Sequence, residues 1–371
     1  YHLKYLKYNG SSWTTTTIEE CASGFAYQAR IALDSTGKPG IAWAYRDGNA
    51  PNSQYLYYIK FDGAAWGTKV EVSGDADMST PSGNPALAFY KTAPNGVDYA
   101  TVFTCNGTVA SPEQHKATSA DTEPTFSAPS TVGNQDCSSL DVFISETDTI
   151  MLVSSPRSGS GGTAYAYYHD GSSWDTGSGT SIFTSVDVVN ESFIFIDDDN
   201  NRNNYHVVMI DDEGVTDKVL YNTFSGGSWS GQETVDSGVD IGKAQIDVVV
   251  DNYNDIPYVF YFDNANNALE YSYKAGGVWT NGTVHNGLSL STNYYDNVAA
   301  DYDPGNTKIV VLGSFMTSAP AFDLNKYELT DLATESQGGV PEFSTFIYTM
   351  TALMLFGMVY WKSEGGRLVG A

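Results

Sequence analysis

The chain contains few positive charges. Its 371 residues include 18 Lys plus Arg against 44 Asp plus Glu, which gives a formal net charge of −26. Such a chain repels polyanions, so the composition argues against nucleic acid as a partner. Charged residues make up only 17% of the sequence, whereas Tyr contributes 26 residues and Gly 36. This composition favours strands and tight turns over helices, whose exposed faces need Glu and Lys.

Cysteine is scarce too, because the chain has only three, and they form no CxxC or Cys/His pattern. That number is too small for a disulfide scaffold, and the spacing argues against zinc. Cys105 and Cys137 are a candidate disulfide in an oxidising compartment. The alternative is that all three cysteines are separate, small buried residues.

One long uncharged run stands near the C-terminus, from Phe343 to Trp361. As a helix its 19 residues would span about 28 Å, close to the hydrocarbon thickness of a bilayer. The sequence therefore predicts a transmembrane helix over 343–361, preceded by a linker over 332–342. Basic residues in the tail 362–371 place it in the cytoplasm and residues 1–331 outside, on the cell surface. The expected location is a single-pass membrane protein with its N-terminus outside.

A short motif, Pro341-Glu342-Phe343, opens this run. The arrangement resembles the PEF-type C-terminal sorting signal of archaeal surface proteins. In that signal a short motif, a hydrophobic span and a basic end are read by a membrane transpeptidase. The resemblance implies processing of the tail, while the apolar run by itself implies an anchor.

An internal repeat of about 54 residues occupies the rest of the chain. Each copy has an aromatic-rich strand, a Gly turn, a Trp and a second strand. Five of the seven tryptophans fall in this register, at positions 13, 66, 174, 229 and 279. The gap between 66 and 174 is two periods, so a copy near residue 120 has lost its Trp.

A second motif alternates with the first: an apolar strand, an Asp-containing turn and another apolar strand. Its aspartates are Asp34, Asp197, Asp251 and Asp301. One period therefore holds two hairpins, which is the pattern of a four-stranded β-propeller blade. The first hairpins number six, near residues 29–47, 85–103, 140–155, 192–210, 244–262 and 297–315.

These hairpins predict an all-β propeller of six four-stranded blades, with residues 1–20 closing the last blade. Residues 322–329 are an alternative third strand of that blade, which would leave fewer closing strands or make seven blades. The repeat resembles the extracellular propellers with sialidase-like or bacterial-surface repeats, a resemblance that concerns architecture.

Two classes of function fit a surface propeller. We expect adhesion or binding of a ligand, such as a glycan or a surface protein, or self-assembly as a unit of a surface layer or appendage. The alternative is a glycoside hydrolase of the sialidase type. That chemistry needs an arginine cluster, and only four arginines precede the apolar run. We therefore expect a protein that is not an enzyme, and no catalytic residue is assigned.

Oxygen-rich turns and sequons are the remaining candidate sites. Calcium suits the turns that contain Asp197, Asp199, Asp251 and Asp255, although Asp and Asn are also ordinary turn formers. No other cofactor is expected. Sequons for N-glycosylation stand at Asn9, Asn106, Asn190 and Asn281.

Overall fold

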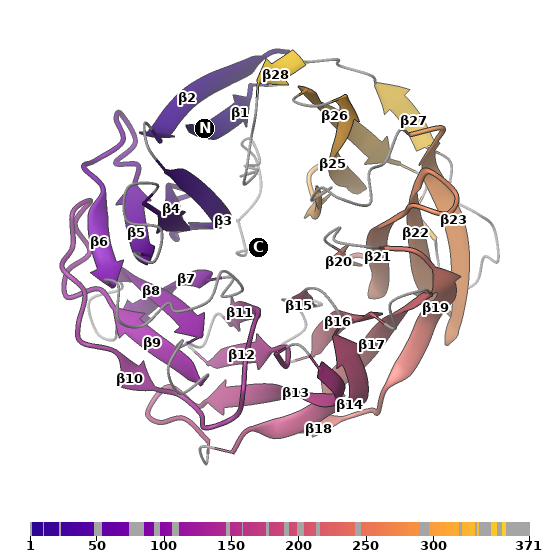
Figure 1. Cartoon of the computed structure of the whole chain (residues 1–371), viewed down its shortest axis with the longest axis horizontal. Helices are drawn as coiled ribbons and strands as arrows, with labels where there is room; N and C mark the ends of the chain where they lie inside the picture. The colour runs from indigo at the N-terminus through magenta and orange to yellow at the C-terminus, as the bar shows by residue number, and fades with distance from the viewer. Residues whose placement is uncertain are drawn as a thin grey trace. The chain divides into compact units, whose positions relative to one another are not determined.

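Antiparallel strands form the described part of the computed structural model (Figure 1). The structure describes residues 2–9, 11–21, 24–47, 54–73, 85–92, 97–105, 111–145, 149–157, 159–175, 178–188, 193–198, 204–212, 216–241, 246–288, 297–318, 321–330, 332–333, 343–346 and 351–353. The chain forms two compact units. The first contains Tyr1–Pro156 and Ala164–Ser181, and the second contains Arg157–Thr163 and Ile182–Met354.

The first unit contains two complete four-stranded meanders, in which each strand pairs antiparallel with the next along the chain. One comprises β3 (Phe25–Leu33), β4 (Pro39–Arg46), β5 (Gln54–Lys60) and β6 (Val70–Ser73); the other comprises β7 (Ala86–Thr92), β8 (Val97–Cys105), β9 (Pro112–Lys116) and β10 (Ser130–Thr131). A hairpin of β1 (His2–Tyr8) and β2 (Trp13–Glu20) precedes them. They are followed by β11 (Leu140–Ile144), β12 (Ile150–Ser154) and β13 (Gly159–His169).

The second unit repeats the same meander. Its strands are β15 (Ile194–Asp198), β16 (Tyr205–Asp212), β17 (Asp217–Ser225), β18 (Ser228–Trp229), β19 (Glu233–Val239), β20 (Ile246–Asp251), β21 (Ile256–Asp263), β22 (Ala268–Ala275), β23 (Val278–Asn286), β24 (Asn297–Asp303), β25 (Lys308–Ser318) and β26 (Ala321–Leu329). A parallel bridge between Val188 and Asp212 joins β14 (Thr180–Val188) to β16.

The six predicted first hairpins are confirmed in the described residues. They are β3–β4, β7–β8, β11–β12, β15–β16, β20–β21 and β24–β25. The alternative for residues 322–329 is also confirmed, because β26 pairs along its length with β25 as the third strand of the last sheet. The predicted closure of the last blade by residues 1–20 is not found among the described strands, because β1 and β2 form a sheet of two and β26 pairs on its other side with residues of the segment 343–353.

Most of the predicted membrane helix over 343–361 lies outside the described residues, as do Pro341 and Glu342. The described residues of that segment form β27 (Phe343–Phe346) and β28 (Thr351–Leu353), which pair with β26. Within the residues that the structure describes, no helix has the length and apolar character needed to cross a membrane.

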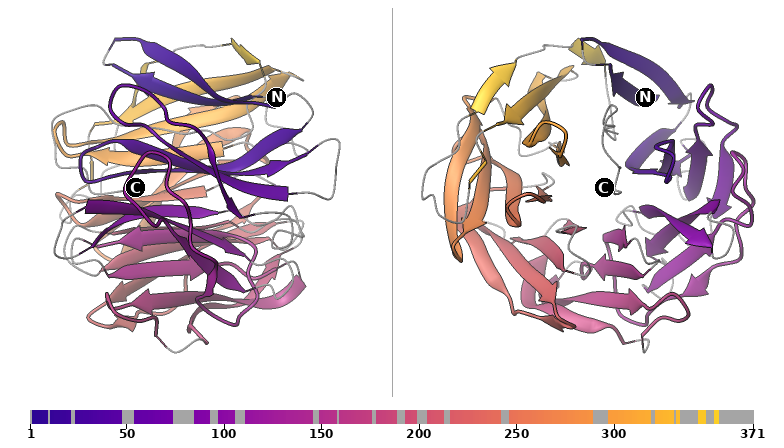
Figure 2. Two further views of the ribbon diagram at one scale, coloured as in Figure 1. Left: turned by 90° about the vertical axis from the view of Figure 1, so that its left-hand side faces the viewer. Right: turned by 180° about the vertical axis from the view of Figure 1, so that it is seen from behind.

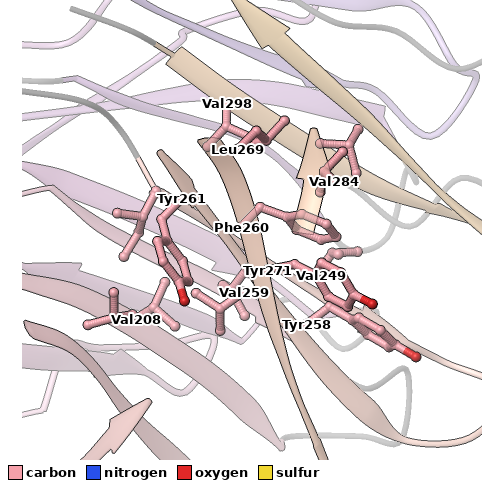
Figure 3. Close-up of a cluster of buried hydrophobic side chains, with 14 of the residues drawn as sticks. Val208, Val249, Tyr258, Val259, Phe260, Tyr261, Leu269, Tyr271, Val284 and Val298 are labelled. Carbon is pink, nitrogen blue, oxygen red and sulfur yellow. The ribbon is translucent and has the colours of Figure 1, made fainter. Parts of the chain in front are cut away.

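Within each unit, successive sheets lie side by side (Figure 2), and apolar residues pack between them. The second strand of a sheet is buried on both faces, since every residue of β16 and of β21 is buried. Figure 3 shows this packing around β21, where Tyr258, Phe260 and Tyr261 meet valines of the neighbouring strands. Continuous apolar runs such as IPYVFYF are what a strand covered on both faces requires.

The repeated Trp occupies the same place in each copy: across a four-residue turn it pairs with a residue at or next to the end of the preceding strand, which is β1 for Trp13 and the third strand of the sheet for the others. The pairs are Tyr8–Trp13, Phe61–Trp66, His169–Trp174, Phe224–Trp229 and Lys274–Trp279. The copy without a Trp is also found. Its pair is Ala117–Phe126, so Phe126 stands where the other copies have Trp.

An edge-to-face ring contact links the third strand of one sheet, or β1 in the first hairpin, to this Trp of the next sheet. Tyr5 meets Trp66 at 5.0 Å between ring centroids, and Tyr221 meets Trp279 at 4.8 Å. Phe126 makes the same contact with Tyr58 at 5.4 Å. At Trp174 the third-strand residue is Gln114, whose side-chain oxygen accepts a hydrogen bond of 3.3 Å from the indole. The contact between one sheet and the turn residue of the next therefore recurs, as a ring contact in three cases and as a hydrogen bond at Trp174.

A buried ion pair holds the first turn of the β3–β6 sheet. The Asp34 carboxylate lies 3.0 Å from the Lys60 ammonium, and both side chains are buried. Asp34 also accepts hydrogen bonds from the backbone N–H groups of Thr36 and Lys38. Burial opposes ionisation of Asp34, but the hydrogen bonds from Lys38, Thr36 and Lys60 together lower its pKa below the ordinary value.

We expect Asp34→Ala to lower the free energy of unfolding by about 3–5 kcal/mol, because it leaves the Lys60 ammonium buried without its counter-ion. The pKa of Asp34 is lower in the folded protein than in the unfolded chain. The stabilisation by the ionised Asp34 is therefore present above the unfolded-state pKa and is lost as the pH falls through the folded-state pKa. Urea unfolding at pH 7 and below pH 4 measures both effects. Asp62→Ala, at an exposed turn aspartate, is the control; equal losses for the two variants would contradict the prediction.

Carboxylates also connect successive sheets of the second unit through backbone N–H groups. Asp197 in β15 accepts a hydrogen bond of 2.8 Å from Val250 in β20, and Asp247 in β20 accepts one of 2.7 Å from Ala300 in β24. Burial, followed by the negative charge of Asp198, raises the pKa of Asp197 well above its ordinary value.

We expect Asp197→Asn to raise the melting temperature at pH 7, since the amide oxygen still accepts the Val250 N–H without a negative charge. The raised pKa means that protonated Asp197 favours the folded state and that this stabilisation is lost as the pH rises. The gain should therefore vanish below the unfolded-state pKa. Thermal unfolding at pH 3 and pH 7 tests this, and a lower melting temperature for the variant at pH 7 would refute it.

Candidate functional site

A charged pair flanks the Tyr221–Trp279 contact in the second unit. Both oxygens of Glu233, on β19, lie 2.7 Å from the Lys274 ammonium, on β22 of the next sheet. The Trp279 indole donates a hydrogen bond of 3.2 Å to Glu233. The Lys274 ammonium also lies 5.3 Å from the Tyr221 ring centroid and 5.9 Å from that of Trp279. We call Tyr221, Glu233, Lys274 and Trp279 the Glu233–Lys274 site.

The four side chains differ in exposure. Tyr221 is buried, whereas Trp279, Lys274 and Glu233 are half-buried. The ring of the buried Tyr221 packs against Trp279. The side chains of Trp279, Lys274 and Glu233 remain partly accessible to solvent. The site therefore combines an indole, a carboxylate and an ammonium whose positions are set by contacts between two sheets.

A polar network lies beside this site. The Asp236 carboxylate accepts a hydrogen bond of 2.6 Å from the Tyr261 hydroxyl and one of 2.9 Å from the Asn281 amide. The Ser272 hydroxyl donates to the Asn281 side-chain oxygen at 2.9 Å. The sequon asparagine Asn281 is therefore held by both ends of its amide. Burial, and then the hydrogen bond to Asp236, raise the pKa of Tyr261 far above its ordinary value.

The first unit also has a Glu–Lys pair beside aromatic rings, on the sheets that the Tyr5–Trp66 contact joins, but its lysine lies against Tyr57 and Tyr45. The Lys69 ammonium lies 2.6 Å from the Glu19 carboxylate and 4.5 Å from the Tyr57 ring centroid. Glu19 belongs to β2, as Glu233 belongs to the fourth strand of its own sheet. The lysine differs in origin, because Lys69 directly precedes β6 whereas Lys274 is the penultimate residue of the third strand, β22. We call Tyr5, Glu19, Tyr57, Trp66 and Lys69 the Glu19–Lys69 site.

Each site can donate and accept hydrogen bonds beside an aromatic surface. The carboxylate accepts from hydroxyl groups, the ammonium donates to them, and the indole offers an apolar face. These groups suit a small ring with hydroxyl groups on its edge and C–H groups on its faces.

Two of the predicted calcium residues, Asp251 and Asp255, share one turn. Asp251 opens the β20–β21 turn, where its carboxylate accepts hydrogen bonds from Tyr253 N–H at 3.0 Å and from the Asn254 amide at 2.6 Å. Asp255 closes the same turn with a positive φ of 56°. Asp197 lies in β15 and Asp199 lies outside the described residues. Within the part of the chain that the structure describes, no group of three or more His, Cys, Asp or Glu side chains could hold a metal ion.

One alignment of the turn aspartates is corrected by the structure. The sequence placed Asp301 in register with Asp251, but Asp303 opens the β24–β25 turn as Asp251 opens its own. Asp303 accepts from Gly305 N–H and from the Asn306 amide in the same manner. The shared pattern is Asp-x-x-Asn, in which the side chains complete the turn.

The other predicted sites fall in different parts of the chain. Asn9 is exposed in the β1–β2 turn, where its side-chain oxygen accepts from the N–H groups of Ser11 and Ser12. Asn106 and Asn190 lie outside the described residues. Cys105 and Cys137 form a disulfide with their Cα atoms 5.7 Å apart, and Cys21 is a buried free cysteine.

The Glu–Lys pairs of the two sites were not identified from the sequence. Trp66 and Trp279 were found from their register, but their Glu partners lie 46 or 47 residues earlier, on a different sheet. The available signal was a Lys close to a register Trp, at Lys69 and Lys274. No local pattern identifies the carboxylate that each lysine meets.

Comparison with known proteins shows the fold. No family model and no curated protein matches the chain. A crystal structure of the fungal lectin from Aleuria aurantia, described as a six-bladed β-propeller with a novel fucose recognition mode, matches 90% of this chain and 98% of its own at 13% identity, with a TM-score of 0.50. The NanB sialidase of Streptococcus pneumoniae, as its K499G mutant, matches 80% of this chain and 66% of its own at 10% identity, with a TM-score of 0.52. The chain is thus similar to β-propellers and has an all-β propeller fold.

Proposed function

We propose that this protein binds carbohydrate, holding a sugar ring at the Glu233–Lys274 site and another at the Glu19–Lys69 site. The observation that carries the proposal is the repeated association of a Glu–Lys pair between sheets with aromatic rings, Tyr221 and Trp279 in the second unit and Tyr57 and Tyr45 in the first. Sugar rings present C–H faces that pack on aromatic side chains and hydroxyl groups that bond to charged groups. The similarity in fold to a fucose-binding lectin agrees with this function.

The carboxylates of Glu233 and Asp236 are arranged to bind a sugar and not to hydrolyse a glycosidic bond. In the second unit the Glu233 carboxylate is neutralised by Lys274 through both oxygens, and Asp236 accepts two hydrogen bonds. Carboxyl groups held in this way are positioned to accept hydrogen bonds. A glycosidase instead needs one carboxyl group with a raised pKa as a proton donor beside the scissile bond.

We expect the protein to bind two molecules of a simple sugar per chain at these sites, and Glu233→Gln to remove one of them. Loss of a charged hydrogen-bonding group should weaken that site by about ten- to a hundredfold. Isothermal titration calorimetry with α-methyl-L-fucoside and a panel of neutral monosaccharides measures the stoichiometry and the affinity. The double variant Glu19→Gln/Glu233→Gln should lose both sites.

Glu328→Gln is the matched control, because Glu328 pairs with Lys308 at 2.8 Å and Lys326 at 2.6 Å, on other strands of the second unit. It should bind as the unmodified protein does. Failure of the unmodified protein to bind any sugar of the panel, or unchanged binding by the double variant, would refute the proposal. Release of sugar from a sialoside or from aryl glycosides would favour the hydrolase alternative.

We further propose that the protein is displayed on a cell surface by the apolar segment 343–361, which leaves the propeller outside. The support for this is the length and composition of the segment and the basic residues that follow it. A surface carbohydrate-binding protein of this kind would serve in adhesion. Assembly into a surface layer is the alternative, and an ordered lattice of propellers on the cell would favour it.

We expect the full chain to sediment with membranes and a chain that ends at Gly338 to be released in soluble form. The physical reason is the transfer of an uncharged 19-residue segment into the bilayer. Membrane fractionation with an alkaline carbonate wash checks this. Recovery of the full chain in the soluble fraction would refute the anchor.

A further inference from the structure

Three tyrosines extend from the Glu19–Lys69 site along the β3–β6 sheet. Tyr55 and Tyr57 occupy alternate positions of β5 and therefore share one face of the strand. Tyr45 lies on β4 directly opposite Tyr55. The Tyr57 ring centroid is 5.9 Å from that of Tyr55 and 5.9 Å from that of Tyr45. All three side chains are half-buried; Tyr45 and Tyr57 pack in part against the apolar cluster that includes Leu3 and Tyr5 of β1, and each tyrosine keeps an accessible part. We call Tyr45, Tyr55 and Tyr57 the tyrosine row.

The row is continuous with the proposed sugar site. The Lys69 ammonium, which pairs with Glu19, lies 4.5 Å from the Tyr57 centroid and 5.7 Å from the Tyr45 centroid. Directly after β5, beyond the buried Ile59, Phe61 contacts Trp66 at 5.5 Å between ring centroids. Aromatic side chains therefore continue from the Trp66 end of the sheet to its β4–β5 end, with the Glu19–Lys69 pair beside them.

The second unit does not repeat this feature at the equivalent positions. The turn pairs Phe61–Trp66 and Lys274–Trp279 align β5 with β22. In this alignment Glu270 stands at the position of Tyr57 and Ala268 at that of Tyr55. The two sites thus share a Trp and a Glu–Lys pair but differ in what continues from them along the strand.

Resting on the proposed function, we infer that the tyrosine row extends the Glu19–Lys69 site into a surface for a neutral oligosaccharide of several rings, whereas the Glu233–Lys274 site takes a single ring. Side chains that share one face of a strand stand about 6.8 Å apart, a spacing at which linked sugar rings can lie on successive aromatic groups. Tyrosine supplies this contact area at low cost in conformational entropy.

The charges near the row favour a neutral chain. Glu19 and Glu71 both lie near Tyr57 and, after burial and in the order Glu71, Tyr55 and Glu19, raise its pKa to about 12. Lys69 is the cation that contacts the row, and Glu19 already pairs with it. An anionic saccharide would meet two carboxylates here, in a chain with a net charge of −26.

The test compares affinities along a series of chain lengths. The probes are α-methyl-L-fucoside and linear neutral oligosaccharides of two to six rings that carry the same terminal fucose. In Glu233→Gln protein, which retains the first-unit site, the affinity should rise about two- to tenfold from the monosaccharide to the longer chains. In Glu19→Gln protein, which retains the second-unit site, the affinity should not depend on length.

Tyr55→Ala in the Glu233→Gln background should remove this rise, so that the ratio of oligosaccharide to monosaccharide affinity falls to about one. Tyr55→Phe keeps the ring and should keep the rise, which separates lost contact from lost folding. Tyr253→Ala removes a tyrosine that is 77% exposed on the β20–β21 turn and is the matched control. A rise that survives Tyr55→Ala, or an equal rise in Glu19→Gln protein, would overturn the inference. Absence of any sugar binding by the unmodified protein would instead overturn the proposed function.

Discussion

The ring contact between the third strand of one sheet and the turn of the next is the interaction on which the structure depends. It recurs as Tyr5–Trp66, Tyr58–Phe126 and Tyr221–Trp279. An edge-to-face pair contributes about 0.5–1.5 kcal/mol beyond the area that it buries. Its larger consequence is geometric, because it sets where the turn of each sheet lies against its neighbour and so fixes the positions of the polar groups around it.

The proposed sites follow from this geometry. A third-strand tyrosine is buried, the tryptophan on it is half-buried, and a lysine and a glutamate from adjacent sheets meet at its edge. The two lysines come from different positions of the repeat, yet both reach the carboxylate of a preceding sheet. The Gln114–Trp174 junction keeps the contact between sheets through a hydrogen bond. The sheet junction is thus the constant element, and the charged pair is an addition at particular junctions.

Much of the fold could be predicted because a strand meander is a local pattern. Alternating apolar residues, turn aspartates and the register of Trp predicted six first hairpins, and all six form in the described residues. The lost Trp near residue 120 was placed by the period, but its replacement by Phe126 was hidden by a longer turn. Asp301 was aligned in place of Asp303 because both lie near the end of the same strand, and only the pairing of Asp303 with Lys308 at the turn distinguishes them.

The sequence by itself determined the strands, their order within each sheet and the positions of the turn tryptophans, since these depend on residues within one period of the repeat. Tertiary structure alone decided which carboxylate each lysine meets and which tyrosines continue from a site. Glu19 and Lys69, like Glu233 and Lys274, lie on different sheets, and 50 or 41 residues separate them. Packing between sheets brings these pairs together. The periodicity of the sequence identifies strands, but it does not identify the residue that a long surface side chain contacts.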